Sequence, residues 1–249
     1  MSRRIVGISL KMYFGHARAT DWFDQVASRV SGHAAVAGGA VEVFVTPTFL
    51  QVPAAVTAFR GTRVRVGGQD VAAEAEGAYT GEVSAAELAE VGAGIAEIGH
   101  AERRRLFGET DADVARKVAR SLEAGLEPLL CIGETERQDP DAAAAVAVTQ
   151  LDASLAGAPG GSVIVAYEPV WAIGAPEPAG DEHVRVVAAA LRAALAGRPG
   201  SAVIYGGAAK PGLLTRLGDA VDGVFLGRFA HDPDTLVDVI DEAAALTYQ

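Results

Sequence analysis

Short apolar segments alternate with longer segments of helical period eight times along the chain, and this alternation is the strongest constraint on its fold. The apolar segments are rich in β-branched residues and have the length of buried parallel strands. Eight strands that are each followed by a helix can close into a barrel. The segments are residues 4–10, 41–46, 63–68, 95–99, 127–132, 162–167, 202–206 and 221–226.

Helices are predicted between these strands, and several have recognisable ends. The candidates include residues 17–31, 84–91, 111–124, 141–156, 181–196 and 232–246. Ser84 followed by Glu87 is a capping-box pattern, and Asp181 and Asp232 are predicted to cap the last two helices. Glycines close other helices, at Gly125, Gly157 and Gly197.

A length of 249 residues is normal for one α/β barrel, so we predict a single (β/α)8 barrel domain over residues 1–249. An open, doubly wound sheet is the structural alternative. Its glycine-rich dinucleotide-binding fingerprint is missing after the first strand.

Composition excludes several classes of partner. The formal net charge of −11 argues against nucleic acid, and the longest basic cluster, Arg103 to Arg105, is interpreted as a salt-linked turn beside Glu102. No apolar run approaches the roughly 20 residues that span a membrane, and no signal peptide is recognisable, so we expect a cytoplasmic protein without a membrane partner. The single cysteine, Cys131, and the scattered histidines imply neither a disulfide nor a metal, and no cofactor is predicted.

Polar side chains follow several of the predicted strands, and in a barrel such residues meet at one mouth. Lys11, His100 and Glu168 follow strands one, four and six, and Gln69 and Asp70 follow strand three. The segments after strands seven and eight, "YGGAAKPG" and "GRFAHD", offer glycines and backbone amides that suit an anion.

These groups suit proton abstraction next to a carbonyl. Glu168 would take the proton, and His100 would polarise the carbonyl and move protons between the two oxygens. Lys11 would balance the negative charge of the substrate and of an enediolate.

Motifs along nearly the whole chain resemble those of the triosephosphate isomerase family. They are "GGQD", "GAYTGEVS", "EIGHAERR", "LFGETD", "CIGE", "AYEPVWAIG" and "YGGAAKPG", in the family's order and at its spacing. The resemblance implies a TIM barrel in which Glu168 is the base, His100 the electrophile and Lys11 the substrate-binding lysine. It also implies that Glu102 is the acid paired with that lysine.

The resemblance further implies that residues 169–179 form a lid over the substrate, with Pro169 and Trp171 at its base. Trp171 is interpreted as part of the hinge, and simple packing is the alternative. Pro176 and Pro178 are expected to stiffen the lid, because proline fixes its own φ and restricts the residue before it. Tyr205 is assigned to the lid group.

The departures from the family pattern gather around the phosphate and the lid. The family's asparagine before the lysine is Ser9, and its serines are Ala101 and Ala208. The resemblance assigns substrate or phosphate binding to Ser9, Gly174, Ala208, Gly227 and Arg228. Arg228 replaces a glycine, and its side chain can point away or reach over the mouth as an extra phosphate clamp.

Three functions stay open. The first is triosephosphate isomerase, which interconverts dihydroxyacetone phosphate and D-glyceraldehyde 3-phosphate. The second is a paralogue acting on a tetrulose phosphate such as erythrulose phosphate, since Ser9 makes room for one more hydroxymethyl group. The third is a barrel that binds sugar phosphates without catalysis.

The stretch "GGQDVAAEAEGAYTGEVS" resembles the family's long third loop, which inserts into a neighbouring subunit. The resemblance implies a homodimer in which Thr80 reaches the other subunit's active-site lysine and Met12 is buried beneath the interface. A monomer with a solvated loop is the alternative.

Overall fold

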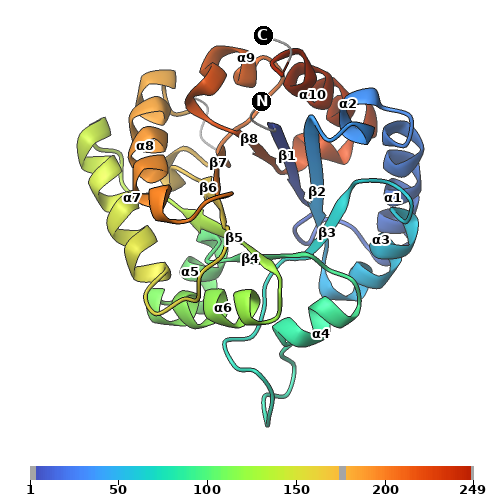
Figure 1. Ribbon diagram of the computed structural model, residues 1–249, viewed down its shortest axis with the longest axis horizontal. Helices are drawn as coiled ribbons and strands as arrows, with labels where there is room; N and C mark the ends of the chain where they lie inside the picture. The colour runs from blue at the N-terminus through green and yellow to red at the C-terminus, as the bar shows by residue number, and fades with distance from the viewer. Residues whose placement is uncertain (1–3, 174–177, 248–249) are drawn as a thin grey trace.

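The computed structural model describes residues 4–173 and 178–247, and these form a closed barrel of eight parallel strands in chain order (Figure 1). The barrel closes where β1 pairs with β8, Ile5 standing opposite Gly223. The strands are β1 Arg4–Ser9, β2 Val41–Thr46, β3 Arg65–Gly68, β4 Ile95–Ile98, β5 Glu127–Ile132, β6 Ile164–Tyr167, β7 Ala202–Tyr205 and β8 Gly223–Leu226.

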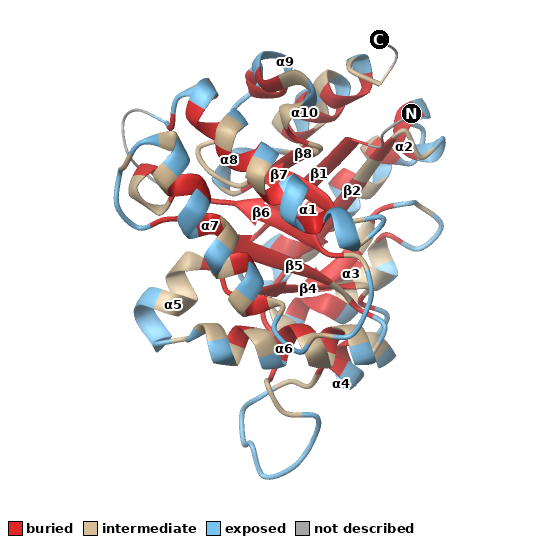
Figure 2. Cartoon of the chain, turned by 60° about the vertical axis from the view of Figure 1, so that its left-hand side comes forward, coloured by how far each residue is buried: buried red, intermediate tan, exposed pale blue. Residues whose placement is uncertain are grey.

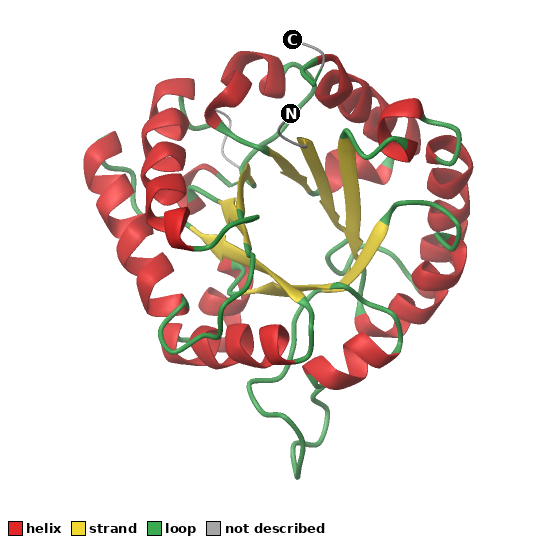
Figure 3. Cartoon of the chain, in the orientation of Figure 1, coloured by secondary structure: helices red, strands yellow, loops and turns green. Residues whose placement is uncertain are grey.

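Helices surround the barrel on its outside (Figure 3). The α-helices are α1 His16–Val30, α2 Ala34–Ala37, α3 Val52–Ala58, α4 Ala85–Glu90, α5 Ala101–Phe107, α6 Asp111–Glu123, α7 Pro140–Ser154, α8 Asp181–Ala194, α9 Leu213–Leu217 and α10 Pro233–Ala245. Short 3-10 turns are η1 Phe49–Gln51, η2 Val170–Ala172, η3 Leu195–Gly197, η4 Gly218–Ala220 and η5 Arg228–His231. None of the helices in the described ranges combines the length and the apolar character needed to cross a membrane.

The predicted strands all form, and their ends move by at most two residues. Ser84 accepts a hydrogen bond from the Glu87 backbone N–H as expected, and Asp232 caps α10. The prediction for Asp181 is wrong. Gly180 is the N-cap of α8 and supplies no side chain, so Asp181 is the first helical residue and favours the helix only through its charge.

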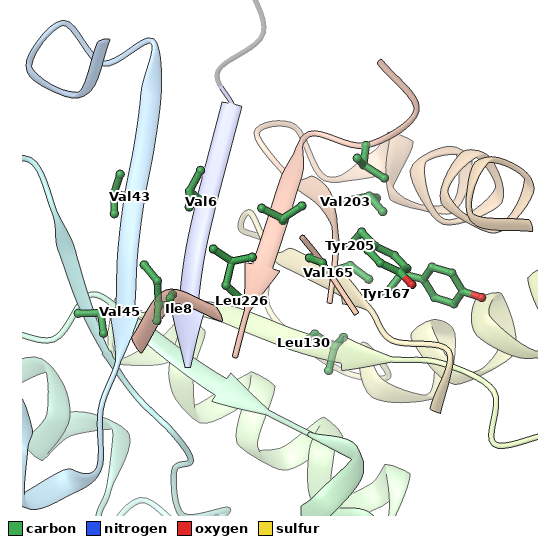
Figure 4. Packing of buried hydrophobic residues seen from close by; sticks show 14 of the residues in the cluster. Val6, Ile8, Val43, Val45, Leu130, Val165, Tyr167, Val203, Tyr205 and Leu226 are labelled. Atoms are coloured by element: carbon green, nitrogen blue, oxygen red, sulfur yellow. The ribbon is translucent and has the colours of Figure 1, made fainter. Parts of the chain in front are cut away.

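The core has two parts because each strand is buried on both faces (Figure 2). A large cluster packs between the strands and the helices, and Figure 4 shows part of it, with Val6, Ile8, Val43 and Val45 on neighbouring strands. A smaller cluster fills the barrel. Its members are Ile5, Phe44, Ile95, Leu129, Cys131, Ile164, Ala166, Ala202, Ile204 and Phe225.

A buried ionic cluster holds the end of β3 against α6. Lys117 Nζ lies 2.6 Å from Asp70 Oδ1 and also contacts Glu109. Arg103 contacts the other oxygen of Asp70 at 2.7 Å. Burial raises the pKa of Asp70 despite these cations, so the carboxylate depends on them to stay charged.

Replacing Lys117 by methionine is expected to lower the free energy of unfolding by about 3–5 kcal/mol, because two carboxylates lose a buried partner. Urea denaturation followed by circular dichroism measures the loss. The matched control is Arg116→Met, since the exposed Arg116 contacts only carboxylates near the surface and should cost less than about 1 kcal/mol. Equal losses in the two variants would contradict the role assigned to the cluster.

Candidate active site

The carboxyl ends of the strands surround a cavity of about 420 Å³. Lys11 follows β1, His100 follows β4 and Glu168 follows β6, and all three side chains line this cavity. The barrel therefore brings together residues that lie far apart in sequence. The cavity is also lined by Ser9, Tyr13, Glu102, Ile173, Gly206, Gly207, Ala208, Ala209, Lys210, Phe225, Leu226, Gly227, Arg228 and Phe229.

Lys11 is held in place from two sides. Its Nζ lies 2.8 Å from Glu102 Oε1, and its carbonyl accepts a hydrogen bond from Gln69 Nε2 at 2.9 Å. Its φ of +47° is uncommon for a residue other than glycine and often marks a functional position. Burial alone would lower the pKa of Lys11, but the hydrogen bond and charge of Glu102 raise it, so the ammonium stays charged.

His100 presents a neutral ring to the cavity. Its Nδ1 accepts a hydrogen bond from the Glu102 backbone N–H at 3.1 Å, so the proton of the neutral ring is on Nε2. Burial, followed by the charge of Lys11, lowers the pKa of His100 to about 4. Nε2 lies 3.8 Å from Glu168 Oε1, and a neutral N–H donor therefore stands beside the carboxylate.

Glu168 is fixed by close backbone packing at the end of β6. Its N–H donates to the Ile132 carbonyl at 2.7 Å. A Cβ on Gly133 would lie 1.8 Å from the Glu168 carbonyl oxygen, and one on Gly206 would lie 2.7 Å from its Cγ, so both flanking positions require glycine. Glu168 Oε2 is buried and accepts no hydrogen bond from any described residue. Burial, followed by the charge of Glu97, raises the pKa of Glu168 to about 8.

The strand-end pattern does not identify Glu97, a second buried carboxylate close to this site. Glu97 lies on β4 two residues after Ile95, which packs inside the barrel, so its side chain also points inward. The Thr46 hydroxyl donates to Glu97 Oε2 at 2.6 Å. Burial raises the pKa of Glu97 to about 7.

Trp171, at the base of the expected lid, is tied to the barrel. Its Nε1 donates to Glu134 Oε1 at 2.7 Å, and the same carboxylate accepts from the Tyr167 hydroxyl at 3.1 Å. His183 Nε2 lies 2.9 Å from that hydroxyl and 3.1 Å from Glu134. Glu134 lies in the quoted "CIGE" motif, so the sequence pointed to this residue. His183 lies in no quoted motif, so the sequence did not point to it.

The expected lid residues are only partly described. Pro169 starts the 3-10 turn that carries Trp171, and Pro178 is exposed, while Gly174 and Pro176 lie outside the described residues. Tyr205 lies inside β7 and is buried, so it belongs to the barrel wall rather than to the loop.

Glycines and cations line the end of the cavity between β7 and β8. Ala208 follows two glycines, and Gly227 and Arg228 follow β8. The Arg228 guanidinium carbon lies 5.9 Å from the centre of the Tyr13 ring, at the rim of the cavity rather than away from it. Lys210, which lies in the quoted "YGGAAKPG" motif but was given no role of its own, lines the same end. This end is suited to an anionic group.

A second cavity of about 380 Å³ shares Ser9, Lys11, His100 and Glu102 with the first. It is also lined by Met12, Thr48, Phe49, Gln69, Asp70, Glu97, Arg103, Leu106 and Phe107. Within the described part of the chain, no three His, Cys, Asp or Glu side chains form a group that could hold a metal ion.

Comparisons with known proteins agree on one family. The family model described as triosephosphate isomerase matches residues 4–243. An L-erythrulose-1-phosphate isomerase of Pectobacterium atrosepticum is 44% identical, and the alignment covers 100% of this chain and 99% of that protein. A triosephosphate isomerase of Leifsonia xyli is 41% identical over 85% of this chain and 84% of its own length. The crystal structure of the Bartonella henselae triosephosphate isomerase superposes with a TM-score of 0.82 at 28% identity, covering 96% of this chain and 98% of that one.

The effect of the Glu97 charge on the pKa of Glu168 should be measurable. Carbon-13 NMR of protein labelled at the glutamate carboxyls should show Glu168 losing its proton near pH 8, with the signal assigned by its absence in Glu168→Gln. In Glu97→Gln the midpoint should move to lower pH, because a neighbouring negative charge that disfavours the carboxylate is removed. The exposed Glu182→Gln is the control and should leave the midpoint in place. A midpoint that stays unchanged in Glu97→Gln would contradict the coupling.

Proposed function

The chain belongs to the triosephosphate isomerase family, and from this premise we propose that it isomerises a four-carbon ketose phosphate of the L-erythrulose 1-phosphate type. It is a sugar-phosphate isomerase, and the open question is the length of its substrate. The observation that carries the proposal is Ser9. This side chain is shorter than the family's asparagine and stands where the catalytic cavity meets the second cavity. The full-length similarity to an L-erythrulose-1-phosphate isomerase supports the same conclusion.

The two candidate substrates differ at one carbon. Dihydroxyacetone phosphate loses a proton from a CH2OH carbon next to its ketone. L-erythrulose 1-phosphate carries one more hydroxymethyl group on the corresponding carbon. An enzyme for the longer substrate therefore needs additional space beside the reacting carbon and no change at the phosphate end.

The proton chemistry is the same for both substrates. Glu168 removes the proton from the carbon next to the ketone, and the electrons of that C–H bond form an enediolate. The neutral His100 N–H polarises the carbonyl and moves a proton between the two oxygens, while the Lys11 ammonium stabilises the negative charge. Glu168 then returns the proton to the adjacent carbon. This step exchanges ketone and aldehyde in a triose phosphate and moves the ketone from carbon 2 to carbon 3 in L-erythrulose 1-phosphate.

The phosphate would lie at the glycine-lined end of the cavity. The backbone amides near Ala208 and Gly227 are its proposed donors, and the cations Arg228 and Lys210 add positive charge. Loop 169–179 is the proposed lid, with Trp171 anchored on Glu134 at its base.

Steady-state kinetics with the two substrates tests the proposal. We expect kcat/KM for L-erythrulose 1-phosphate to exceed that for dihydroxyacetone phosphate by tenfold or more, which corresponds to about 1.4 kcal/mol. Glu168→Gln serves as the control for contaminating isomerases. It should lose activity by orders of magnitude on both substrates while still binding a phosphorylated inhibitor. A preference for the triose would return the function to triosephosphate isomerase, and undiminished activity of Glu168→Gln would refute the assigned base.

We also propose that the protein acts as a homodimer. Residues 75–82, which include Thr80, form an exposed loop that projects from the barrel (Figures 1 and 2). Met12 and Phe107 are 92% and 70% exposed, and they line the outer end of the second cavity. Apolar side chains so exposed suit a surface that a second copy covers.

Light scattering should give about twice the 25.5 kDa mass of the chain. Met12→Glu should shift the equilibrium to monomers, because it places a charge in the proposed interface. The control is Val146→Glu on the outer helix α7, where an equally polar change should leave the mass unchanged. A wild-type protein at the mass of one chain would contradict the proposal.

A further inference from the structure

Glu97 is a buried acid that the proposed proton transfers do not use. It is 3% exposed on β4 and points into a barrel interior that is otherwise filled mainly by apolar side chains. Burying a carboxylate costs free energy unless hydrogen bonds compensate. An acid at this position therefore needs an interaction that offsets this cost or a function that requires it.

The surroundings of Glu97 are polar. Thr46 donates to Oε2 at 2.6 Å, and the nearby Ser9 hydroxyl opposes the effect of burial on the pKa of Glu97. The Ser9 oxygen in turn lies 3.4 Å from the Lys11 backbone N–H, which donates to it. Ser9 is therefore a neighbour both of Glu97 and of the lysine of the catalytic cavity.

The carboxylate faces a space beside the reacting groups. The buried residues that line the second cavity are Ser9, Asp70, Glu97 and His100, whereas its apolar lining includes exposed side chains. Ser9 and His100 also line the catalytic cavity. A substituent on the reacting carbon can therefore extend from the first cavity toward Glu97.

Glu97 has unused capacity for hydrogen bonds. An ionised carboxylate offers about four lone-pair positions, and the Thr46 hydroxyl occupies one of them. A hydroxyl group is the complementary ligand, because it donates to a carboxylate and can accept from a neighbouring ammonium such as that of Lys11.

We propose that Glu97 is a specificity-determining residue that accepts a hydrogen bond from the terminal hydroxyl of a four-carbon ketose phosphate. This inference rests on the proposed function and names the group that recognises the additional hydroxymethyl. A three-carbon substrate cannot make this contact. A site built to bind a substrate hydroxyl discriminates strongly against an analogue that lacks the hydroxyl, since its buried polar group then loses a partner.

The test compares kcat/KM of Glu97→Leu and Glu97→Gln for L-erythrulose 1-phosphate and for dihydroxyacetone phosphate. Glu97→Leu should lower the value for the four-carbon substrate by about a hundredfold and the value for the triose by less than about tenfold. Glu97→Gln keeps an acceptor oxygen and should give a smaller change in the same direction. If Glu97→Leu fails to fold, the ratio measured for Glu97→Gln decides.

The matched control is Thr46→Ser, which keeps the hydroxyl donor to Glu97 and should retain the wild-type ratio of the two substrates. A wild type that prefers the triose would overturn the proposed function together with this inference. A wild type that prefers the four-carbon substrate, combined with Glu97 variants that lose both activities equally, would overturn only the inference.

Discussion

One ammonium group, that of Lys11, faces three carboxylates at the mouth of the barrel. Glu102 contacts it directly, while the charges of Glu168 and Glu97 act on it from further away. Burial disfavours the ionised form of each buried carboxyl group, and the pKa values of Glu168 and Glu97 rise to about 8 and about 7. The lysine thus offsets the negative charge of these acidic groups, and Lys210 and Arg228 add positive charge at the other end of the cavity.

Burial and the same cation together keep the histidine neutral. Burial disfavours the imidazolium of His100, and the positive charge of Lys11 acts in the same direction. The ring therefore remains neutral and keeps an N–H that can donate to a carbonyl oxygen. Lys11 is held by a backbone at positive φ and by the contact of its ammonium with Glu102, which fixes its charge beside the cavity. These groups are ordered when the barrel folds, so ordering them does not add to the free-energy barrier of the reaction.

Much of the fold and part of the site could be predicted from the sequence, for a physical reason. Strands in a parallel barrel are apolar on both faces, so their positions are readable, and polar residues directly after them must meet at one mouth. Because the strands are apolar on both faces, the sequence does not show that Glu97 points into the barrel. In the segment "IAEIG" apolar residues stand on both faces, so no alternation indicates whether Glu97 points inward or outward. The contacts of His183 with Tyr167 and Glu134 depend on how α8 packs against the barrel, which no local pattern records.

Ser9 and Glu97 are best understood as a pair. A longer amide at position 9 would take up part of the cavity that Ser9 and Glu97 line together. A serine leaves that space open, but without an acid beneath it the enlarged cavity would offer only volume, which discriminates weakly between substrates. In the proposed function the two residues combine space with a specific acceptor beside Lys11, His100 and Glu168. On this proposal a change of substrate length needs only Ser9 and Glu97 beside the site, because the proton transfers assigned to Lys11, His100 and Glu168 are the same for both substrates.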